Sequence, residues 1–137
     1  MINQKQFNEI QAYFNKHKGA TIFLGYVFHM VEAVYIEFME YKSGFVVSYK
    51  GGIDIPVLDL TRSVINNFLM DNIVKIREGS NSLGLWLNPN NNRLYIDISR
   101  RYDSIHNAID TAKFNDQLYI YDCKKKQSFN TWTMQYE

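Results

Sequence analysis

The sequence is poor in cysteine, proline and glycine, with one, two and seven of them in 137 residues. The single cysteine, Cys123, has no partner for an intramolecular disulfide, as is usual in proteins of a reducing cytosol. The chain also lacks any run of about 18 apolar residues, and its first residues, Met1 to Phe7, contain no apolar core of signal-peptide length. We therefore expect a cytoplasmic protein that is neither secreted nor embedded in a membrane.

The chain has no surplus of charge of either sign. Fifteen Lys and Arg residues face 14 Asp and Glu residues, which gives a formal net charge of +1 at pH 7. Nucleic acids attract proteins through a positive field, and no such field surrounds the chain as a whole. Only a local basic patch would still allow nucleic-acid binding.

What the sequence does contain is a composition suited to one folded domain. Hydrophobic residues make up 46% and charged residues 21%, close to globular averages, which argues against disordered and low-complexity chains. A chain of this length buries roughly two thirds of its unfolded surface, and no linker or repeat divides it. We predict a single domain over residues 1–137, with an N-terminal part (1–82) and a C-terminal part (83–137).

The first part of the chain predicts a helix followed by strands. Phe7, Ile10 and Phe14 recur at spacings of three and four, which indicates the apolar face of a helix that ends at Gly19. Residues 21–58 are rich in Val, Ile, Tyr and Phe, and we predict an antiparallel meander there. A proline in this region, Pro56, would restrict the last strand to an edge position or to its end.

Residues 25–41 allow two interpretations. The alternation of Val34, Ile36 and Phe38 with their neighbours favours a strand. Val27 and Val31, taken together with Val34 and Phe38, also fit the apolar stripe of a helix. Because the segment is so rich in β-branched and aromatic residues, the strand is favoured and the helix is kept as the alternative.

A second helix is predicted after an N-cap at Asp59 or Thr61, where apolar residues recur at helical spacing. The helix would end by residues 78–81. Its apolar face would consist of Val64, Ile65, Phe68, Leu69 and Ile73.

The C-terminal part predicts a hairpin of strands 83–87 and 94–99 around the turn residues 88–92. A third helix would follow an N-cap at Asp103 or Ser104, with Asn115 as a left-handed stop. Further strands are expected at residues 118–121 and, more weakly, 129–134. The predicted fold class is α+β: a mostly antiparallel sheet with about three helices, ending in a β-hairpin–helix–strand module.

The same region carries a series of short motifs. Gly84-Leu85-Trp86 precedes the turn, Tyr95-Ile96-Asp97-Ile98-Ser99 follows it, and Gln117-Leu118-Tyr119-Ile120-Tyr121-Asp122 comes after the helix. The series resembles a C-terminal module of small, uncharacterised proteins encoded by phages, plasmids and other mobile elements. The resemblance implies a mobile-element origin. Each shared residue also has a structural explanation: Gly84 would open a strand, Trp86 would anchor the core, and Gln117 would pair backbone groups near the helix end. The resemblance carries over no catalytic residue.

Groups that could hold a metal are few. Three histidines, His17, His29 and His106, and the thiol of Cys123 are the available nitrogen and sulfur ligands. None of them is paired at the spacing of ligands on one helix turn or one strand face, so we predict no metal site and no cofactor.

Two weak arrangements point to catalysis. Lys124, Lys125 and Lys126 follow Cys123, and positive charge beside a thiol would lower its pKa and activate it as a nucleophile. Two pairs of acidic residues, Asp97 with Asp122 on adjacent strands and Asp103 with Asp110 near the helix, could serve in acid–base work or hold a hydrated cation. A small enzyme is therefore one hypothesis, behind two others.

Basic and aromatic residues cluster toward the C-terminus. Seven basic and five acidic residues lie between positions 93 and 126, a net charge of +2. On one edge of a sheet such residues would bind nucleic acid, or a protein partner, through charge and stacking. The candidate binding residues are Arg93, Arg100, Arg101, Tyr102, Lys124, Lys125 and Lys126, with Tyr95 beside them.

The absence of a catalytic motif and the mobile-element resemblance together favour an interaction protein that is not an enzyme. We expect it to bind a host protein and inhibit it, with a defence nuclease as the natural target, in the manner of anti-CRISPR or anti-restriction proteins. Exposed Tyr and Trp side chains would anchor the interface. An accessory protein that binds nucleic acid through the basic residues is the alternative.

Overall fold

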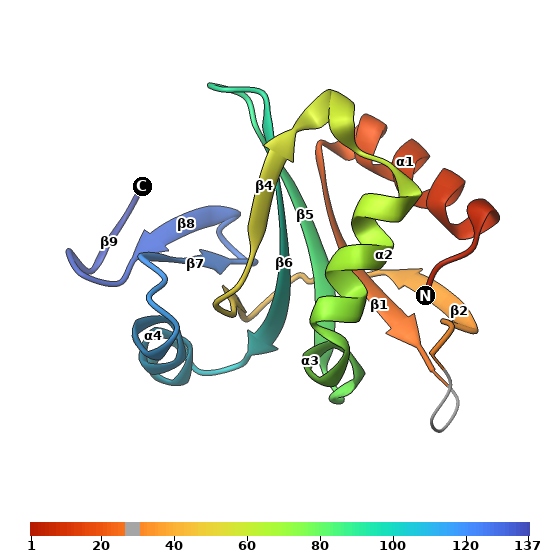
Figure 1. Cartoon of the computed structure of the whole chain (residues 1–137). Coiled ribbons are helices and arrows are strands. Elements are labelled where there is room, and N and C mark those ends of the chain that lie inside the picture. Colours follow the sequence, from red (N-terminus) through yellow and green to blue (C-terminus); the bar gives the residue numbers. More distant parts are fainter. Residues whose placement is uncertain (27–30) are drawn as a thin grey trace.

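A computed structural model describes residues 1–26 and 31–137 of the chain (Figure 1). The helical elements are α1 (Gln4–His17), the single turn η1 (Val57–Asp59), α2 (Arg62–Asp71), α3 (Ile73–Arg77) and α4 (Ile105–Phe114). The strands are β1 (Gly19–Gly25), β2 (Tyr35–Phe38), β3 (Phe45–Ser48), β4 (Ile53–Pro56), β5 (Asn81–Asn88), β6 (Arg93–Tyr102), β7 (Tyr119–Asp122), β8 (Gln127–Asn130) and β9 (Gln135–Tyr136). None of the helices in these residues is long and apolar enough to cross a membrane.

The strands form one antiparallel sheet in the order β2-β1-β5-β6-β3-β7-β8-β9. Strand β4 also pairs with β6, beside β3, so that β6 has β5 along one edge and β3 and β4 along the other. The predicted α+β class with a mostly antiparallel sheet is confirmed. The predicted meander is wrong, however, because β2 and β3 are consecutive in sequence but have β1, β5 and β6 between them in the sheet.

Helix α1 ends close to the expected place, and both of its ends are capped. The side chain of Asn3 accepts a hydrogen bond from the backbone of Gln6, and the Gln6 side chain accepts one from the backbone of Asn3, which together make a capping box. Lys18 takes the left-handed conformation that ends the helix, and Gly19 starts β1.

The ambiguous segment 25–41 contains no helix in its described residues. Strands β1 and β2 pair antiparallel, with Leu24 opposite Ile36 and Ile22 opposite Phe38. The helical alternative is thus wrong for residues 31–41, while Val27 and His29 lie outside the described residues. As expected, Pro56 ends the short strand β4, where the lack of an N–H group costs no ladder hydrogen bond.

The second predicted helix is split in two. Thr61, one of the two predicted N-caps, caps α2 by accepting a hydrogen bond from Val64 N. At Asn72 the chain leaves helical geometry, and the Asn72 side chain donates to Phe68 O, an acceptor at the end of α2. A short helix, α3, then continues in a new direction.

The C-terminal part contains the predicted hairpin, β5–β6, whose register runs from Asn81–Arg100 to Asn88–Arg93. Ser104 caps α4, but Asn115 is not the left-handed residue: Asp116 is, with φ of 55°. The predicted strand 129–134 is also wrong after Asn130, whose side-chain oxygen accepts from Trp132 N and Thr133 N and turns the chain back.

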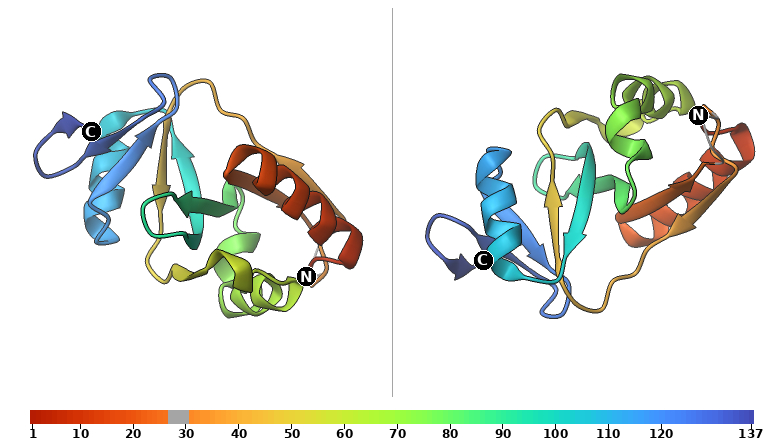
Figure 2. Two further views of the ribbon diagram at one scale, coloured as in Figure 1. Left: turned by 90° about the horizontal axis from the view of Figure 1, so that it is seen from above. Right: turned by 90° about the horizontal axis from the view of Figure 1, so that it is seen from below.

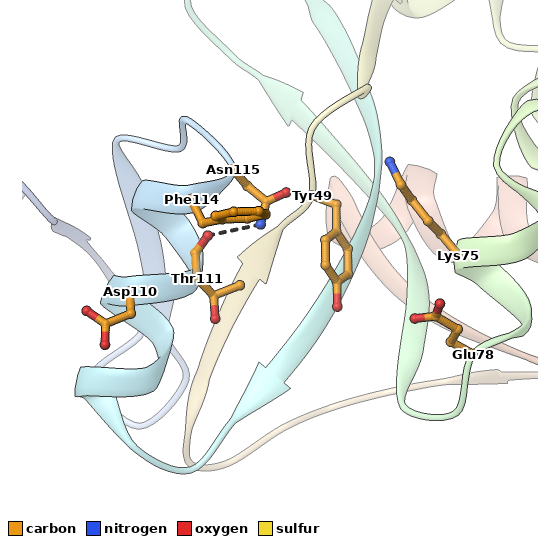
Figure 3. A pocket seen from close by; sticks show the side chains of 7 residues that line it. All are labelled: Tyr49, Lys75, Glu78, Asp110, Thr111, Phe114 and Asn115. Atoms are coloured by element: carbon orange, nitrogen blue, oxygen red, sulfur yellow. Dashed lines mark hydrogen bonds between the residues drawn. The ribbon is translucent and has the colours of Figure 1, made fainter.

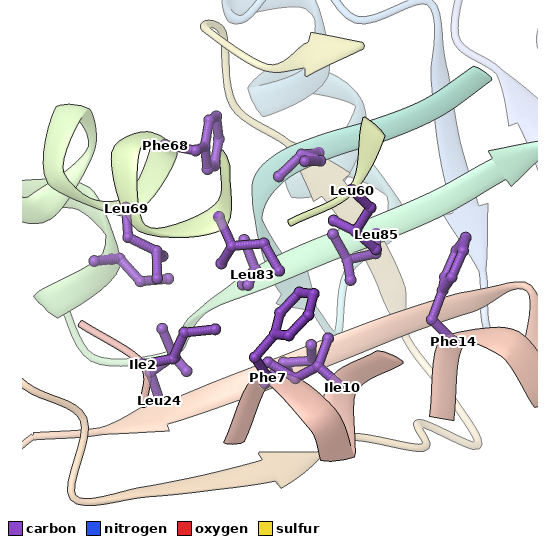
Figure 4. Close-up of a cluster of buried hydrophobic side chains, with 14 of the residues drawn as sticks. Ile2, Phe7, Ile10, Phe14, Leu24, Leu60, Phe68, Leu69, Leu83 and Leu85 are labelled. Carbon is purple, nitrogen blue, oxygen red and sulfur yellow. The ribbon is translucent and has the colours of Figure 1, made fainter. Parts of the chain in front are cut away.

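All helices pack on one face of the sheet. On the β5–β6 side of that face, Leu83, Leu85, Leu94, Ile96 and Ile98 are buried, and they meet buried side chains of α1, α2 and α3 (Figure 4). A second cluster lies under α4. It consists of Val47, Ala108, Ile109, Ala112, Ile120 and Phe129.

None of the helices in residues 1–26 and 31–137 lies on the opposite face of the sheet. The chain between β2 and β3, residues 39–44, runs along this side, away from α2 and α3 (Figure 2). It starts beside β1, where Met39 N donates to Thr21 O, and ends at β6, where Arg101 Nε donates to Ser43 O at 2.8 Å. We call residues 39–44 the crossing segment. It passes the part of the face that holds Ser82 and Ser99, which are buried although no helix covers them.

Candidate functional site

A groove lies between α3 and α4 on the helix-covered face (Figure 3). Its volume is about 530 Å³, and Tyr49 lies between the two helical walls. The lining residues are Tyr49, Lys75, Glu78, Asp110, Thr111, Phe114 and Asn115.

Most polar groups of this groove are already used within the chain. Asn115 accepts from Lys50 N and donates to Thr111 O, and Lys75 Nζ donates to Lys50 O at 3.0 Å. Burial, together with a hydrogen bond to Tyr102, raises the pKa of Tyr49. The groove therefore offers an exposed Phe114 ring and single carboxylates, but no convergent set of catalytic groups.

The helix-free face offers a different surface at the end of the β5–β6 hairpin. Trp86 and Tyr95 are cross-strand partners there, with ring centroids 5.5 Å apart, and the indole extends over Gly19 of β1. Trp86 is 54% exposed. We call Gly19, Gly84, Trp86, Tyr95 and Asp97 the open face.

The position of Trp86 corrects one expectation. Trp86 was expected to anchor the core, but side chains alternate along a strand, and Leu83, Leu85 and Leu87 take the inward positions. Trp86 therefore points outward, with Gly84 and Tyr95 on the same face.

Asp97 lies next to Tyr95 on the open face and is half-buried. Its Oδ2 accepts from Ser48 Oγ at 2.9 Å, and its Oδ1 lies against Gly84, in the space that a Cβ would need. Burial raises the pKa of Asp97, and the Ser48 hydrogen bond opposes that rise only in part. Gly84 was expected to open a strand, but β5 starts three residues earlier. Gly84 instead makes room for the Asp97 carboxylate.

Asp97 and Asp122 do not form a carboxylate pair. Strand β3 separates their strands, and Asp122 faces the side of the sheet that carries the helices, in register with Phe45 and Tyr102. Its two oxygens accept from Lys124 N, Lys125 N and the Tyr136 hydroxyl. Burial raises the pKa of Asp122, but these hydrogen bonds and the Lys125 charge outweigh it and leave the pKa below its ordinary value.

The lysines do not activate Cys123. Burial raises the pKa of its thiol, and the nearby Arg101 charge offsets this only in part. A nucleophilic thiol needs a lowered pKa, so the predicted activation of Cys123 by the lysines is wrong. Within the part of the chain that the structure describes, no three His, Cys, Asp or Glu residues gather to hold a metal; His29 lies outside it.

The candidate basic residues fall on different surfaces. Arg93 and Arg101 share the helix-free face but are eight residues apart on β6, about 27 Å. Arg93 pairs with Asp54 at 2.8 Å and Arg101 with Asp103 at 2.7 Å.

The other candidates lie on the helix-covered face or in a turn. Arg100 and Tyr102 point to the helix side, where the guanidinium group lies over the Tyr102 ring at 5.5 Å. Lys124, Lys125 and Lys126 form the turn between β7 and β8, with the Lys125 ammonium 4.0 Å from the centre of the Tyr136 ring. The seven residues therefore do not make one continuous edge.

Gln117 pairs backbone groups near the end of α4, as its expected structural role requires. Its backbone N donates to Ala112 O at the end of α4, and its side chain reaches Tyr49 O. The open face was missed at the level of sequence, although the alternation Leu83-Gly84-Leu85-Trp86-Leu87 already places Trp86 opposite the leucines.

No protein-family model, curated protein or solved structure matches this chain.

Proposed function

We propose that this chain is a binding protein without enzymatic activity, whose open face docks on another protein and inhibits it. The observation that carries the proposal is the exposed Trp86–Tyr95 pair on a sheet face without helices. Large aromatic side chains dominate the energy of protein interfaces when a partner covers them. Nothing within the described residues covers this pair.

The charges around the open face favour a protein over a nucleic acid. The two arginines of the helix-free face, Arg93 and Arg101, are paired with Asp54 and Asp103, whereas no ion pair involves Asp97 or Glu37 among the residues that the structure describes. Phosphate binding depends on uncompensated positive charge, which these two paired arginines do not supply. Interface cores, by contrast, are enriched in aromatic residues and poor in net charge.

The partner in this proposal is a host protein, and a defence nuclease of the CRISPR or restriction type is the first candidate. Its support is the resemblance of residues 84–122 to the module of phage and mobile-element proteins. Small proteins of such elements act inside a host cell, where blocking one host enzyme requires a rigid surface and no chemistry of their own.

The test compares two exposed tryptophans, the only two of the chain. Tagged wild-type protein, Trp86→Ser and Trp132→Ser are used to capture partners from nuclease-treated host lysate, and the captured protein is then purified for titration. Trp132 is the matched control because it is 72% exposed but lies in the turn after β8. We expect Trp86→Ser to weaken binding at least about 30-fold, roughly 2 kcal/mol, and Trp132→Ser to change it less than about threefold.

Equal loss in both variants, or in neither, would exclude the open face as the docking surface. Inhibition is measured as the activity of the purified partner with and without the protein. If the partner keeps full activity when it is saturated with the protein, the docking part of the proposal stands and the inhibition part is wrong.

Nucleic-acid binding is the second candidate, favoured by the exposed aromatic rings of Trp86, Tyr119 and Tyr121 on one sheet face. Bases stack on such rings, provided that cations hold the backbone. The Lys124–Lys126 turn begins three residues after Tyr121 and carries positive charge. Binding that falls steeply with salt and is lost when the three lysines are changed to Ala would favour this candidate over the first.

A further inference from the structure

We infer that Asp97 is the receptor for a cationic side chain, most suitably an arginine, that the partner protein inserts on the open face beside Trp86 and Tyr95. This inference rests on the proposed function and names the chemistry of the partner at one point of the interface.

The first argument is the hydrogen-bond count of Asp97. An ionised carboxylate accepts about four hydrogen bonds, and Asp97 receives one, from Ser48 Oγ to Oδ2. Neither a donor nor a cation meets Oδ1 among residues 1–26 and 31–137. The two arginines on the same face are engaged elsewhere, with Asp54 and Asp103.

The second argument is the environment. Asp97 is half-buried in the middle of the sheet, with the backbone of Gly52 close to its Cβ and Gly84 beneath Oδ1. Burial without a cation disfavours the ionised form and raises the pKa of Asp97. A positive charge placed beside the carboxylate by a partner would remove this penalty, which makes the pairing favourable only in the complex.

The third argument is the adjacent aromatic pair. Tyr95 is two positions from Asp97 on the same strand face, and Trp86, the partner of Tyr95, is diagonal to Asp97 across β5 and β6. Such neighbours are about 7–8 Å apart, within reach of long side chains. A guanidinium group can lie on an aromatic ring and donate two hydrogen bonds to a carboxylate at the same time, whereas an ammonium group cannot use both geometries equally well.

Small residues keep this position accessible. Gly84 on β5 and Gly52, just before β4, flank Asp97, and among the described residues only the Ser48 side chain donates to it. Larger residues at these positions would cover the carboxylate. The combination of an unpaired carboxylate, small neighbours and two rings matches the needs of a guanidinium group.

The test is an NMR titration of the full chain with N-acetyl-argininamide at pH 7.5 and low salt. The signals followed are the Trp86 indole N–H and the Asp97 carboxyl carbon. N-acetyl-citrullinamide is the control ligand, because it has the same shape without the charge. We expect saturable shifts with arginine, in the millimolar range for a single side chain, and affinity at least about tenfold lower with citrulline.

Asp97→Asn and Asp54→Asn are compared in the same titration. Both remove one negative charge from the same sheet face, but Asp54 is already paired with Arg93. We expect Asp97→Asn to weaken arginine binding at least about tenfold and Asp54→Asn to weaken it less than about twofold. Equal shifts with citrulline, or unchanged binding in Asp97→Asn, would overturn the inference.

The capture experiment with Trp86→Ser separates this inference from the proposed function. If Trp86→Ser loses the partner while arginine does not bind at Asp97, the docking surface stands and the cation site is wrong. If arginine binds but Trp86→Ser keeps the partner fully, the docking surface is wrong, and with it the role assigned to Asp97.

Discussion

Two aspartates of the sheet have opposite relations to their surroundings. Asp122 receives three hydrogen bonds that favour its ionised form, and its pKa lies below the ordinary value. Asp97 receives one hydrogen bond, and burial raises its pKa. Folding stability should therefore depend on pH in opposite directions at the two sites.

The first prediction concerns Asp97. Because its pKa is raised on folding, its contribution to stability is complete below the ordinary value of 3.8 and is lost as pH rises through the raised value. Asp97→Asn cannot ionise, so it should be more stable than the wild type at pH 7, by about 1 kcal/mol, and similar to it at pH 3.5. Urea unfolding of both proteins between pH 3.5 and 8 measures the difference.

A control for this series is Asp116→Asn, which removes an exposed carboxylate paired with Lys50. Exposed ion pairs contribute little, so it should lie within about 0.5 kcal/mol of the wild type throughout. A difference between Asp97→Asn and wild type that stays constant over the pH range would contradict the prediction.

The second prediction concerns Asp122. Its pKa is lowered on folding, so its contribution is present above 3.8 and is lost as pH falls through the lowered value. Asp122→Ala should destabilise the protein by about 1–3 kcal/mol at pH 7, because the N–H groups of Lys124 and Lys125 lose their acceptor. The loss should shrink at low pH. Unfolding at pH 7 and pH 2.5 tests both points, and an equal loss at the two pH values would argue against the assigned cause.

At the scale of elements, the pairing of β5 with β6 depends on a glycine. Gly84 faces Asp97 across the two strands, and a Cβ at position 84 would overlap the Asp97 carboxylate. The third prediction is that Gly84→Ala destabilises the protein by about 1–3 kcal/mol, because either the carboxylate or the strand must move.

A double-mutant cycle identifies the cause. Asp97→Ala removes the obstacle, so Gly84→Ala should cost less than about 0.5 kcal/mol in that background. Thermal or urea unfolding of the four proteins gives the coupling energy. If Gly84→Ala costs the same with and without Asp97, the clash is not the reason for the glycine.

How much of each element the sequence predicts depends on how local its determinants are. Caps and turns are local: Asn3 and Gln6 cap α1, Thr61 caps α2, and residues 88–92 form the hairpin turn, so the helices and the β5–β6 hairpin lie close to where periodicity places them. The break between α2 and α3 also depends on a nearby side chain, that of Asn72, but an asparagine within a helical pattern does not by itself predict a break.

Strand neighbours are not local. Alternation identifies residues 35–38 and 45–48 as strands. It does not show that these two strands are not neighbours, or that β3 pairs with β6 and β7. The candidate site has the same limit. The spacing of Asp97 and Asp122 suggested adjacent strands, but β3 lies between those strands, and its register aligns Asp122 with Tyr102, which faces away from Asp97.

For the whole molecule, the question is whether two hydrophobic clusters unfold as one. The larger cluster lies under α1, α2 and α3 and the smaller under α4, but β6 runs from one to the other: Leu94, Ile96 and Ile98 belong to the larger cluster, and Tyr102 packs against the smaller. A shared central strand couples the clusters, so the fourth prediction is a single cooperative transition.

The two tryptophans make this measurable. Trp86 lies on β5, a strand of the larger cluster, and Trp132 follows β8, a strand of the smaller cluster. Single-tryptophan variants, Trp86→Phe and Trp132→Phe, should show the same urea midpoint by fluorescence and by circular dichroism, once each is corrected for its own stability. Two separated midpoints would mean that the two hydrophobic clusters unfold independently.

The order of strands also determines when the sheet can be assembled during synthesis. Strands β1 and β3 leave the ribosome early, but their partners β5 and β6 extend to Tyr102. The β5–β6 hairpin gives β1 its second neighbour and β3 its first, but the other edge of β3 waits for β7, which ends at Asp122. The nascent chain must therefore carry open strand edges through most of its translation, and β7 closes the last edge of β3.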